Sequence, residues 1–269
     1  PIWAAFVTSG DVTNPLVETA EGTTPARVTT ESALRTALEN GVSGIVLGED
    51  IDINTALNVT STLTLDLNGC TLRMTGNTSV FYVYNNATLT IQDSSAAKSG
   101  TITGGNAGDG GGVYIGDNSS EGHLVMTGGT ITGCATDLSR GAGRGGGVFV
   151  FKGSFTMSGT AKITNCTADW GGGVVVHTRS STFTMNGGEI SDCKASNTGG
   201  GVCLIGGAGF EMTGGIIRDC TADWRRESSA IYLDPGTMKA HGGTVKGSVC
   251  VSGGGNCVIT HEPSQEGYT

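Results

Sequence analysis

A four-residue motif, Thr-Ala-Asp-Trp, occurs twice in the chain and supplies the side chains best suited to bind a ligand. It places Asp169 beside Trp170 and, further along, Asp223 beside Trp224. An indole ring can stack on the apolar face of a sugar while a carboxylate accepts its hydroxyl groups, and the same carboxylates could border a Ca²⁺ ion. The alternative is structural, because Trp can shield the flank of a fold and Asp suits glycine-rich turns.

A second group of candidates recurs at one position of a repeated strand, between apolar residues that point the opposite way. The group consists of Tyr114, Phe149, Val175, Cys203 and Tyr232. An apolar row on an outer face is unusual for a surface that meets only water. We expect the row either to bind a partner or a second copy of the chain, or to be covered by a loop or another part of a larger protein.

Catalytic and metal-binding motifs are weak by comparison. His177 is the one histidine on this outer row, with Lys152 one coil earlier, and such a pair is more typical of a surface than of a general base. The Gly-rich stretch near Gly141 lacks the Lys-Ser/Thr and the helix of a phosphate-binding loop. No His-Glu-x-x-His, Gly-x-Ser-x-Gly or Cys-x-x-Cys motif occurs. We therefore predict no catalytic residue, no metal ligand and no cofactor, with Ca²⁺ at the Asp residues as the alternative.

Charge and composition exclude several classes of partner. The 269 residues include 15 basic and 24 acidic ones, so the net charge of −9 disfavours nucleic acid and anionic lipid. No apolar stretch approaches the roughly 20 residues of a membrane-spanning helix, and we expect no membrane insertion. The 47 Gly, only 5 Pro and 37% hydrophobic residues indicate an ordered, glycine-punctuated β protein. Because the sequence opens at Pro1 without a signal-like leader, we expect a mature or trimmed chain.

An internal repeat positions these candidates. Four copies begin with Gly-Gly-Gly-Val, at Gly110, Gly145, Gly171 and Gly199, and a degenerate fifth begins at Ser228. The unit is a Gly-rich turn, an apolar strand, a loop, a strand with Met, a turn, a strand with Ile, and then Cys. Short strands with two-residue alternation predict β structure, and a unit that cannot bury its own apolar face predicts a stacked solenoid.

Equivalent positions of successive copies are expected to stack as columns. One column holds Met126, Met157, Met185, Met212 and Met238, a second holds Ile131, Ile163, Ile190, Ile217 and Val245, and a third holds Cys134, Cys166, Cys193 and Cys220. We interpret all three as interior columns in which Cys is a small apolar side chain, with disulfides between neighbouring coils as the alternative. Cys250 and Cys257 flank a Gly-rich loop, and a local disulfide between them is a separate hypothesis.

The segments around the repeat complete the predicted architecture. Residues 30–40 carry an apolar stripe of Leu34, Ala37 and Leu38 at helical spacing. A helix there would cover the open end of the first coil. We predict an N-terminal segment with this capping helix over residues 1–44, a parallel β-helix of about seven or eight coils over 45–251, and a C-terminal tail or cap over 252–269.

The repeated Gly-Gly-Gly-Val units, Leu-Thr-Leu-Asp-Leu-Asn-Gly from Leu63, and the helix segment from Ala33 resemble right-handed parallel β-helix proteins of the pectin-lyase-like kind. More narrowly, the chain resembles Gly-rich β-helix repeat regions of large surface proteins from Gram-positive gut bacteria. The resemblance implies an all-β, right-handed parallel β-helix with an N-terminal capping α-helix. The enzymes of this kind carry acidic or Arg/Lys clusters on the first strand row, where this chain has its apolar row, so no catalytic residue carries over.

We therefore expect a secreted or cell-surface module, in the bacterial cell wall, that binds glycan or a host or bacterial surface protein without its own chemistry. The residues expected to bind are Tyr114, Phe149, Val175, Tyr232, Trp170, Trp224, Asp169 and Asp223. Self-association through the outer row is a further expectation. The alternatives are a polysaccharide lyase or glycoside hydrolase, and a structural stalk within a larger surface protein.

Overall fold

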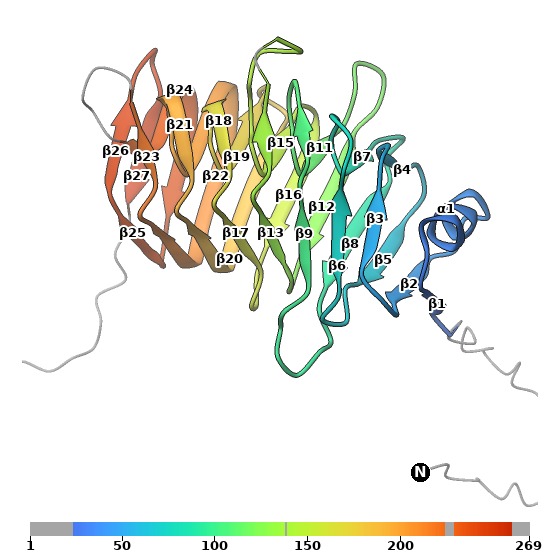
Figure 1. Cartoon of the computed structure of the whole chain (residues 1–269). Helices are drawn as coiled ribbons and strands as arrows, with labels where there is room; N and C mark the ends of the chain where they lie inside the picture. Colours follow the sequence, from blue (N-terminus) through green and yellow to red (C-terminus); the bar gives the residue numbers. More distant parts are fainter. Residues whose placement is uncertain (1–23, 138, 224–228, 260–269) are drawn as a thin grey trace, which may run out of the picture.

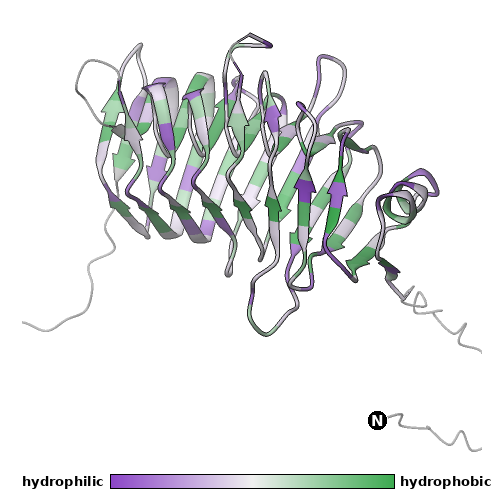
Figure 2. Ribbon diagram, viewed as in Figure 1, coloured by the Kyte–Doolittle hydropathy of each residue, from purple (hydrophilic) through white to green (hydrophobic). Residues whose placement is uncertain are grey.

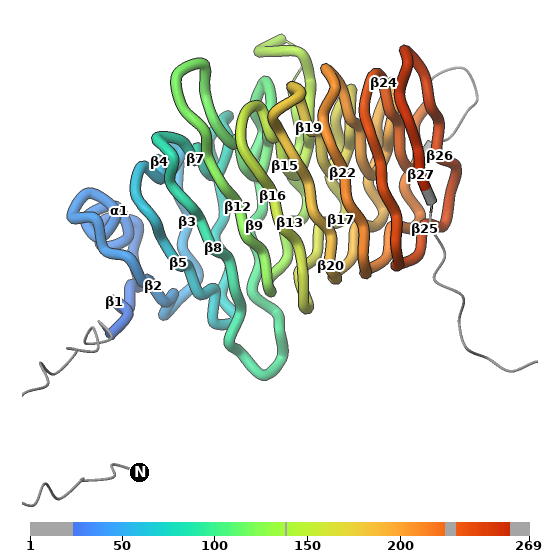
Figure 3. Tube along the Cα trace, turned by 180° about the vertical axis from the view of Figure 1, so that it is seen from behind, coloured from blue at the N-terminus to red at the C-terminus, as the bar shows by residue number. Residues whose placement is uncertain are grey.

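The computed structural model describes residues 24–137, 139–223 and 229–259. This part of the chain is a parallel β-solenoid of about seven turns, as the fold class predicted (Figure 1). Each coil contributes one strand to each of three long rows, which we name rows A, B and C in the order in which the chain visits them within one repeat copy. Seen from behind, the coils keep the same stacking order from α1 to β27 (Figure 3).

The rows contain the following elements. Row A is β4 (Leu57–Val59), β7 (Phe81–Val83), β11 (Val113–Ile115), β15 (Val148–Val150), β19 (Val174–His177), the first parts of β22 (Val202–Arg218) and β24 (Ser229–Ala240), and β26 (Ser248–Val251). Row B is β1 (Ala26–Val28), β2 (Gly44–Leu47), β5 (Leu63–Asp66), β8 (Thr88–Gln92), β12 (Gly122–Met126), β16 (Gly153–Met157), the first part of β20 (Thr182–Ser191), later parts of β22 and β24, and β27 (Asn256–Ile259). Row C is β3 (Ile51–Ile53), β6 (Thr71–Met74), β9 (Thr101–Thr103), β13 (Thr130–Thr132), β17 (Lys162–Thr164), the ends of β20 and β22, and β25 (Thr244–Lys246).

A smaller parallel sheet lies on the path from row C back to row A. It contains β10 (Asn106–Ala107), β14 (Ala135–Thr136), β18 (Thr167–Trp170), β21 (Lys194–Thr198) and β23 (Thr221–Ala222). β14, β18, β21 and β23 directly follow the Cys of a repeat copy, and all five strands precede the start of the next copy. They therefore carry the chain towards the outer side of row A, where the candidate apolar row lies.

The interior is built from stacked like residues, as the repeat predicts. The rings of Phe155, Phe183 and Phe210 stack with centroids 4.7 Å apart in each step. Met157 pairs in register with Met185, and Met185 pairs with Met212. Apolar residues recur along every row of strands (Figure 2). Alternation along each strand thus separates one continuous core from the outer faces.

One member of the predicted Met column is misplaced. Met238 pairs with Phe210, and Ala240 pairs with Met212, so Met238 belongs to the column of Phe rings. The Ile column is as predicted, because Ile217 pairs with Val245. The shift by two residues keeps the Met238 side chain inside, since residues two apart on a strand share a face.

The helix predicted over residues 30–40 is α1, Glu31–Glu39. The Thr30 hydroxyl accepts a hydrogen bond from the Ala33 backbone N–H at 3.2 Å, which caps the first turn. Leu34 and Ala37 are buried, and the helix contacts β1, β3 and β4 at the N-terminal end of the described part. Parallel pairing extends beyond the predicted 45–251 range on both sides, because β1 pairs with β2 and β27 pairs with β24.

A buried carboxylate holds the corner between rows B and C in the early coils. Asp93 is 5% exposed and accepts backbone hydrogen bonds from Gly69 at 2.9 Å, Ser95 at 3.0 Å and Gly100 at 2.7 Å. Burial alone would raise the pKa of Asp93, but these hydrogen bonds outweigh it and hold the pKa below the ordinary value of 3.8. The carboxylate therefore stabilises the fold above the unfolded-state pKa, and this stabilisation is lost as the pH falls through the folded-state pKa.

Asp93→Asn is expected to lower the free energy of unfolding by about 1–3 kcal/mol at neutral pH, because one amide N–H₂ would face the backbone donors. Urea unfolding of both proteins from pH 7 down to pH 2 measures the difference. The gap should narrow once wild-type Asp93 becomes protonated. An equal difference in the free energy of unfolding at every pH would show that the charge of Asp93 does not contribute to stability.

Candidate functional site

The outer residues of row A stack in one column, as the repeat predicts. Tyr114 pairs in register with Tyr82 on one side and Phe149 on the other, and the column continues through the later coils. Its remaining members are Val175, Cys203, Tyr232 and Cys250. From Tyr114 onward, these side chains belong to a second apolar cluster, separate from the main core. The predicted column is therefore present in the structure, and its capacity to bind a ligand depends on the solvent exposure of its side chains.

Most of this column is covered. Phe149, Val175 and Cys203 are fully buried, and Tyr232 is 5% exposed. The Arg144 guanidinium lies over the Phe149 ring, 4.6 Å from its centroid, and Trp170 packs on the same cluster. Of the two alternatives for the row, the covered one holds for Phe149, Val175 and Tyr232.

The Gly triplets direct the chain so that it covers the outer residues of row A. The first glycine of each triplet has a positive φ, +68° at Gly145 and +59° at Gly171, which turns the chain sharply back on itself. The residue before the triplet then lies over the strand that follows it. Thr198 shows the same arrangement, because its Oγ1 lies 4.0 Å from the Cys203 Sγ. In the copies that begin at Gly145 and Gly199, the residue before the triplet therefore covers the outer residue of its own copy.

An aromatic surface remains accessible over the middle coils. Tyr82, Tyr114, Phe151 and His177 are half-buried. The last three contact the buried ring of Phe149, and Tyr82 contacts Tyr114. Ring centroids are 5.5 Å apart for Tyr82–Tyr114, 6.3 Å for Tyr114–Phe151 and 5.6 Å for Phe151–His177, the last pair being stacked. We call these five residues the aromatic surface. It presents ring faces and edges on a rigid support.

Three members of the aromatic surface were not among the residues predicted to bind. Tyr82 belongs to an earlier coil whose sequence departs from the repeat, although it pairs in register with Tyr114. Phe151 and His177 follow the outer positions Phe149 and Val175 by two residues, so they share the outer face. Alternation had already placed His177 on the outer row, without a binding role, and the same alternation could have identified Phe151.

The charges beside the aromatic surface are fixed. Arg144 makes a two-point ion pair with Asp109, at 3.1 Å from Nε to Oδ1 and 2.7 Å from Nη2 to Oδ2. Burial raises the pKa of Tyr114 to about 12, so its hydroxyl stays protonated. Burial, reinforced by Arg144, lowers the pKa of His177, which favours the neutral imidazole at neutral pH. The surface is thus a set of uncharged rings beside a neutralised ion pair.

A hollow of about 180 Å³ adjoins the aromatic surface at Phe151. Its walls combine one ring with an ammonium group, a carboxylate, an amide and two hydroxyls, and its lining residues are Asp117, Asn118, Phe151, Lys152, Thr178 and Ser180. Asp117 is held in place by the backbone N–H groups of Ser119 and Ser120, at 2.7 and 2.6 Å. The hollow therefore offers an apolar wall and several oriented polar groups within one small volume.

The Thr-Ala-Asp-Trp motif has a structural role where the structure describes it. Trp170 ends β18 and is half-buried against the outer cluster of row A. Asp169 accepts a hydrogen bond from the Ser196 hydroxyl of the next coil at 2.5 Å. Asp223 is exposed directly after β23, and Trp224 lies outside the described residues. Asp169 and Trp170 lie on the flank beside row A, and neither they nor Asp223 line the hollow.

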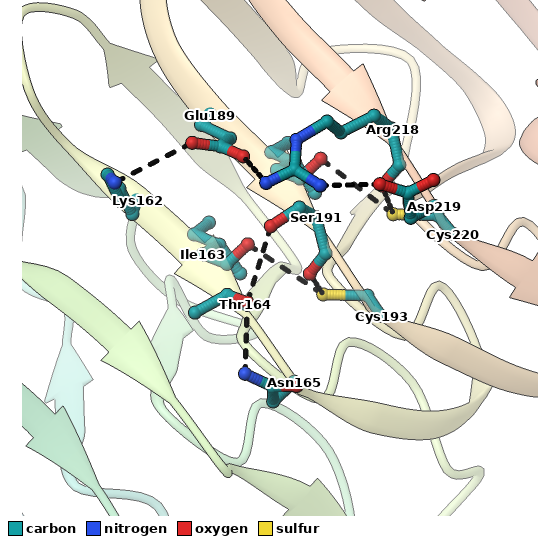
Figure 4. Close-up of polar contacts among 11 residues, drawn as sticks. Lys162, Ile163, Thr164, Asn165, Glu189, Ser191, Cys193, Arg218, Asp219 and Cys220 are labelled. Atoms are coloured by element: carbon teal, nitrogen blue, oxygen red, sulfur yellow. Dashed lines mark hydrogen bonds and ion pairs between the residues drawn. The ribbon is translucent and has the colours of Figure 1, made fainter. Parts of the chain in front are cut away.

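A polar cluster on the outer face of row C links three coils (Figure 4). Glu189 forms ion pairs with Lys162 at 3.6 Å and with Arg218 at 2.5 Å, and Arg218 also pairs with Asp219. Asn165, Asp192 and Asp219 adopt left-handed backbone conformations with φ of 54–55° at the following corner. Each precedes a Cys, so these polar residues shape the turn that directs the thiol inward.

The separate hypothesis about Cys250 and Cys257 is wrong in this structure. The structure contains no disulfide between Cys250 and Cys257. Cys250 packs against the outer cluster of row A, whereas Cys257 packs against the main core from row B. Because the two strands present these residues to opposite sides of the coil wall, their sulfur atoms do not meet.

In residues 24–137, 139–223 and 229–259, no three His, Cys, Asp or Glu side chains are grouped as metal ligands. No helix in these ranges is long and apolar enough to cross a bilayer. Comparisons with protein-family models, curated proteins and solved structures give no significant match.

Proposed function

We propose that this protein is a non-catalytic glycan-binding module that works outside the cell or at a cell surface. The observation that carries the proposal is the accessible part of the aromatic surface, which adjoins a hollow lined by hydroxyl, amide, carboxylate and ammonium groups. Sugar rings have apolar C–H faces and hydroxyl edges, so they are recognised by this combination of ring faces and oriented polar groups.

The size of the hollow favours a sugar unit at the edge of a larger ligand. At about 180 Å³ it is smaller than the roughly 300–1,000 Å³ of sites that enclose a drug-sized molecule. Phe151 supplies the apolar wall, and Thr178 and Ser180 supply hydroxyls from the next coil. Neighbouring sugar units would then lie over Tyr114 and Tyr82, one coil apart each. Because the strands are paired in register, this spacing is set by the backbone and needs no rearrangement on binding.

Two variants separate loss of binding from loss of folding. Phe151→Ser removes the ring that the hollow and the aromatic surface share. Ser180→Trp fills the hollow from an exposed loop position and leaves the packed rings untouched. The matched control is Thr160→Trp, which adds the same bulk at an exposed turn outside the hollow.

The test is a glycan array followed by titration of the glycans that bind. Wild type should bind a defined set of glycans, and both Phe151→Ser and Ser180→Trp should lose about tenfold or more in affinity, which corresponds to about 1.4 kcal/mol. Thr160→Trp should bind like wild type. An array without any bound glycan, or variants that bind as tightly as wild type, would overturn the proposal.

A further inference from the structure

Four thiols form a continuous column inside the solenoid. Cys134, Cys166 and Cys193 are fully buried, and Cys220 is 5% exposed. The residues that follow them pair in register from strand to strand, Ala135 with Thr167 as the first step. The sulfur of Cys166 interacts with the sulfurs of both neighbouring rungs, and Cys193 does the same one rung later.

The spacing of the column suits a covalent link between neighbouring rungs. Adjacent parallel strands lie about 4.8 Å apart, which is inside the range of about 4.4–6.8 Å between the Cα atoms of a disulfide. Each Cys also sits at a corner, between a left-handed residue and a short strand, as Asn165 and β18 illustrate for Cys166. A bent backbone at this point can adjust to a sulfur–sulfur bond without disturbing a long ladder of hydrogen bonds.

The buried thiol outside the column, Cys203, is not placed to form a disulfide with a member of the column. Cys203 is equally buried, but it lies in the outer cluster of row A, apart from the main core that holds the column. If only neighbouring rungs can bond, all four thiols are used in one arrangement alone, Cys134 with Cys166 and Cys193 with Cys220. A central bond between Cys166 and Cys193 would leave Cys134 and Cys220 three rungs apart.

We propose that the column is an oxidation site, at which a small-molecule disulfide such as oxidised glutathione converts Cys193–Cys220 and Cys134–Cys166 into two rung-to-rung disulfides. The Cys220 thiol loses its proton to solvent, attacks the small disulfide, forms a mixed disulfide and releases one small thiolate. The Cys193 thiolate then attacks the Cys220 sulfur and releases the second. Each bond thus oxidises two protein thiols, whose protons pass to solvent and to the released thiolates, and reduces one small disulfide to two thiols.

The order of the two bonds follows from access. Cys220 is the one member of the column with measurable exposure, so oxidation begins at its pair. Hydrogen bonds from Cys166 and Cys220 lower the pKa of the Cys193 thiol, which favours the thiolate needed for the second step. The hydrogen bond with Cys193 and burial raise the pKa of Cys220 well above its ordinary value, so proton loss from Cys220 limits the rate of the first step. Cys134 and Cys166 react later, because both are fully buried.

The experiment exposes the reduced protein to oxidised glutathione, once in the native state and once during refolding from urea. Remaining thiols are alkylated in denaturant, and a non-reducing digest is mapped by mass spectrometry. The Cys193–Cys220 link should appear first in the native arm, and both links should be present after refolding, with Cys203 alkylated. The oxidised protein should also melt several degrees higher than the reduced one.

Two variants sharpen the result. Cys193→Ala should abolish the Cys193–Cys220 link and preserve Cys134–Cys166. Cys203→Ala, the matched loss of a buried thiol outside the column, should preserve both. Complete alkylation of all four column thiols in both arms, or links that join the column to Cys203, would overturn the proposal.

Discussion

Phe183→Ala is expected to lower the free energy of unfolding by about 3–5 kcal/mol, the range typical of a large aromatic residue removed from a core. Phe183 is fully buried and lies between two parallel rings, Phe155 and Phe210, each 4.7 Å away. Its removal therefore opens a cavity in the middle of a stack and exposes two ring faces to it. Urea unfolding of the variant and of wild type measures the loss.

The matched control is Thr184→Ala on the same strand. Thr184 pairs with Thr156 on the outer face of row B and is half-buried, so its loss is expected to change the free energy of unfolding by no more than about 0.5 kcal/mol. Equal effects of the two substitutions would contradict the assignment of inner and outer positions in this row.

Gly145→Ala is expected to destabilise the fold by about 3 kcal/mol or more. Gly145 has φ of +68°, where a Cβ atom alone is unfavourable by about 1–2 kcal/mol. A methyl group there would also overlap the Val148 carbonyl and approach the Cα of Phe149 to 3.0 Å. Because both neighbours are backbone atoms of row A, the chain could accommodate the methyl group only by moving the strand, which adds a packing penalty.

Gly41→Ala is the control that separates the cost of a positive φ from the cost of a steric clash. Gly41 has φ of +66°, almost the same as Gly145, but no atom lies within 4 Å of the position a Cβ would take. Its substitution should lower the free energy of unfolding by about 1–2 kcal/mol. Circular dichroism during urea unfolding compares the pair, and equal losses at the two glycines would show that the close approach at Gly145 has no energetic role.

The repeat made the interior of this fold predictable. A column such as Met157, Met185 and Met212 is a set of equivalent letters in the sequence and a set of in-register neighbours in the structure. The prediction failed at Met238, where the degenerate fifth copy shifts by two residues. Alignment by residue type assigned Met238 to the wrong column, because positions 238 and 240 both face inward and alternation cannot distinguish them.

The outer face was harder to predict, because its exposure depends on where the connecting segments go. Alternation correctly placed Phe149 outside the main core, but only the path of the chain through Arg144 and Gly145 shows that the ring is covered. Likewise, Phe151 and His177 become a site only because loops of two coils close a hollow beside them. Such tertiary proximity leaves no periodic signal in the sequence.

The structure also changes which substitutions can test binding. Replacing Phe149 or Tyr232 by Ser would place a hydroxyl in the buried outer cluster, and the expected result is loss of packing. Substitutions at Phe151 and Ser180 act at the accessible part of the surface. They therefore separate recognition from stability.

The most direct test of glycan binding at the aromatic surface is a nuclear magnetic resonance titration with a glycan selected on the array, observing the aromatic ring signals. The signals of Tyr82, Tyr114, Phe151 and His177 should shift in proportion to occupancy, while those of the interior rings Phe155 and Phe183 stay in place. Shifts confined to residues on rows B and C, with these four rings unchanged, would contradict the account.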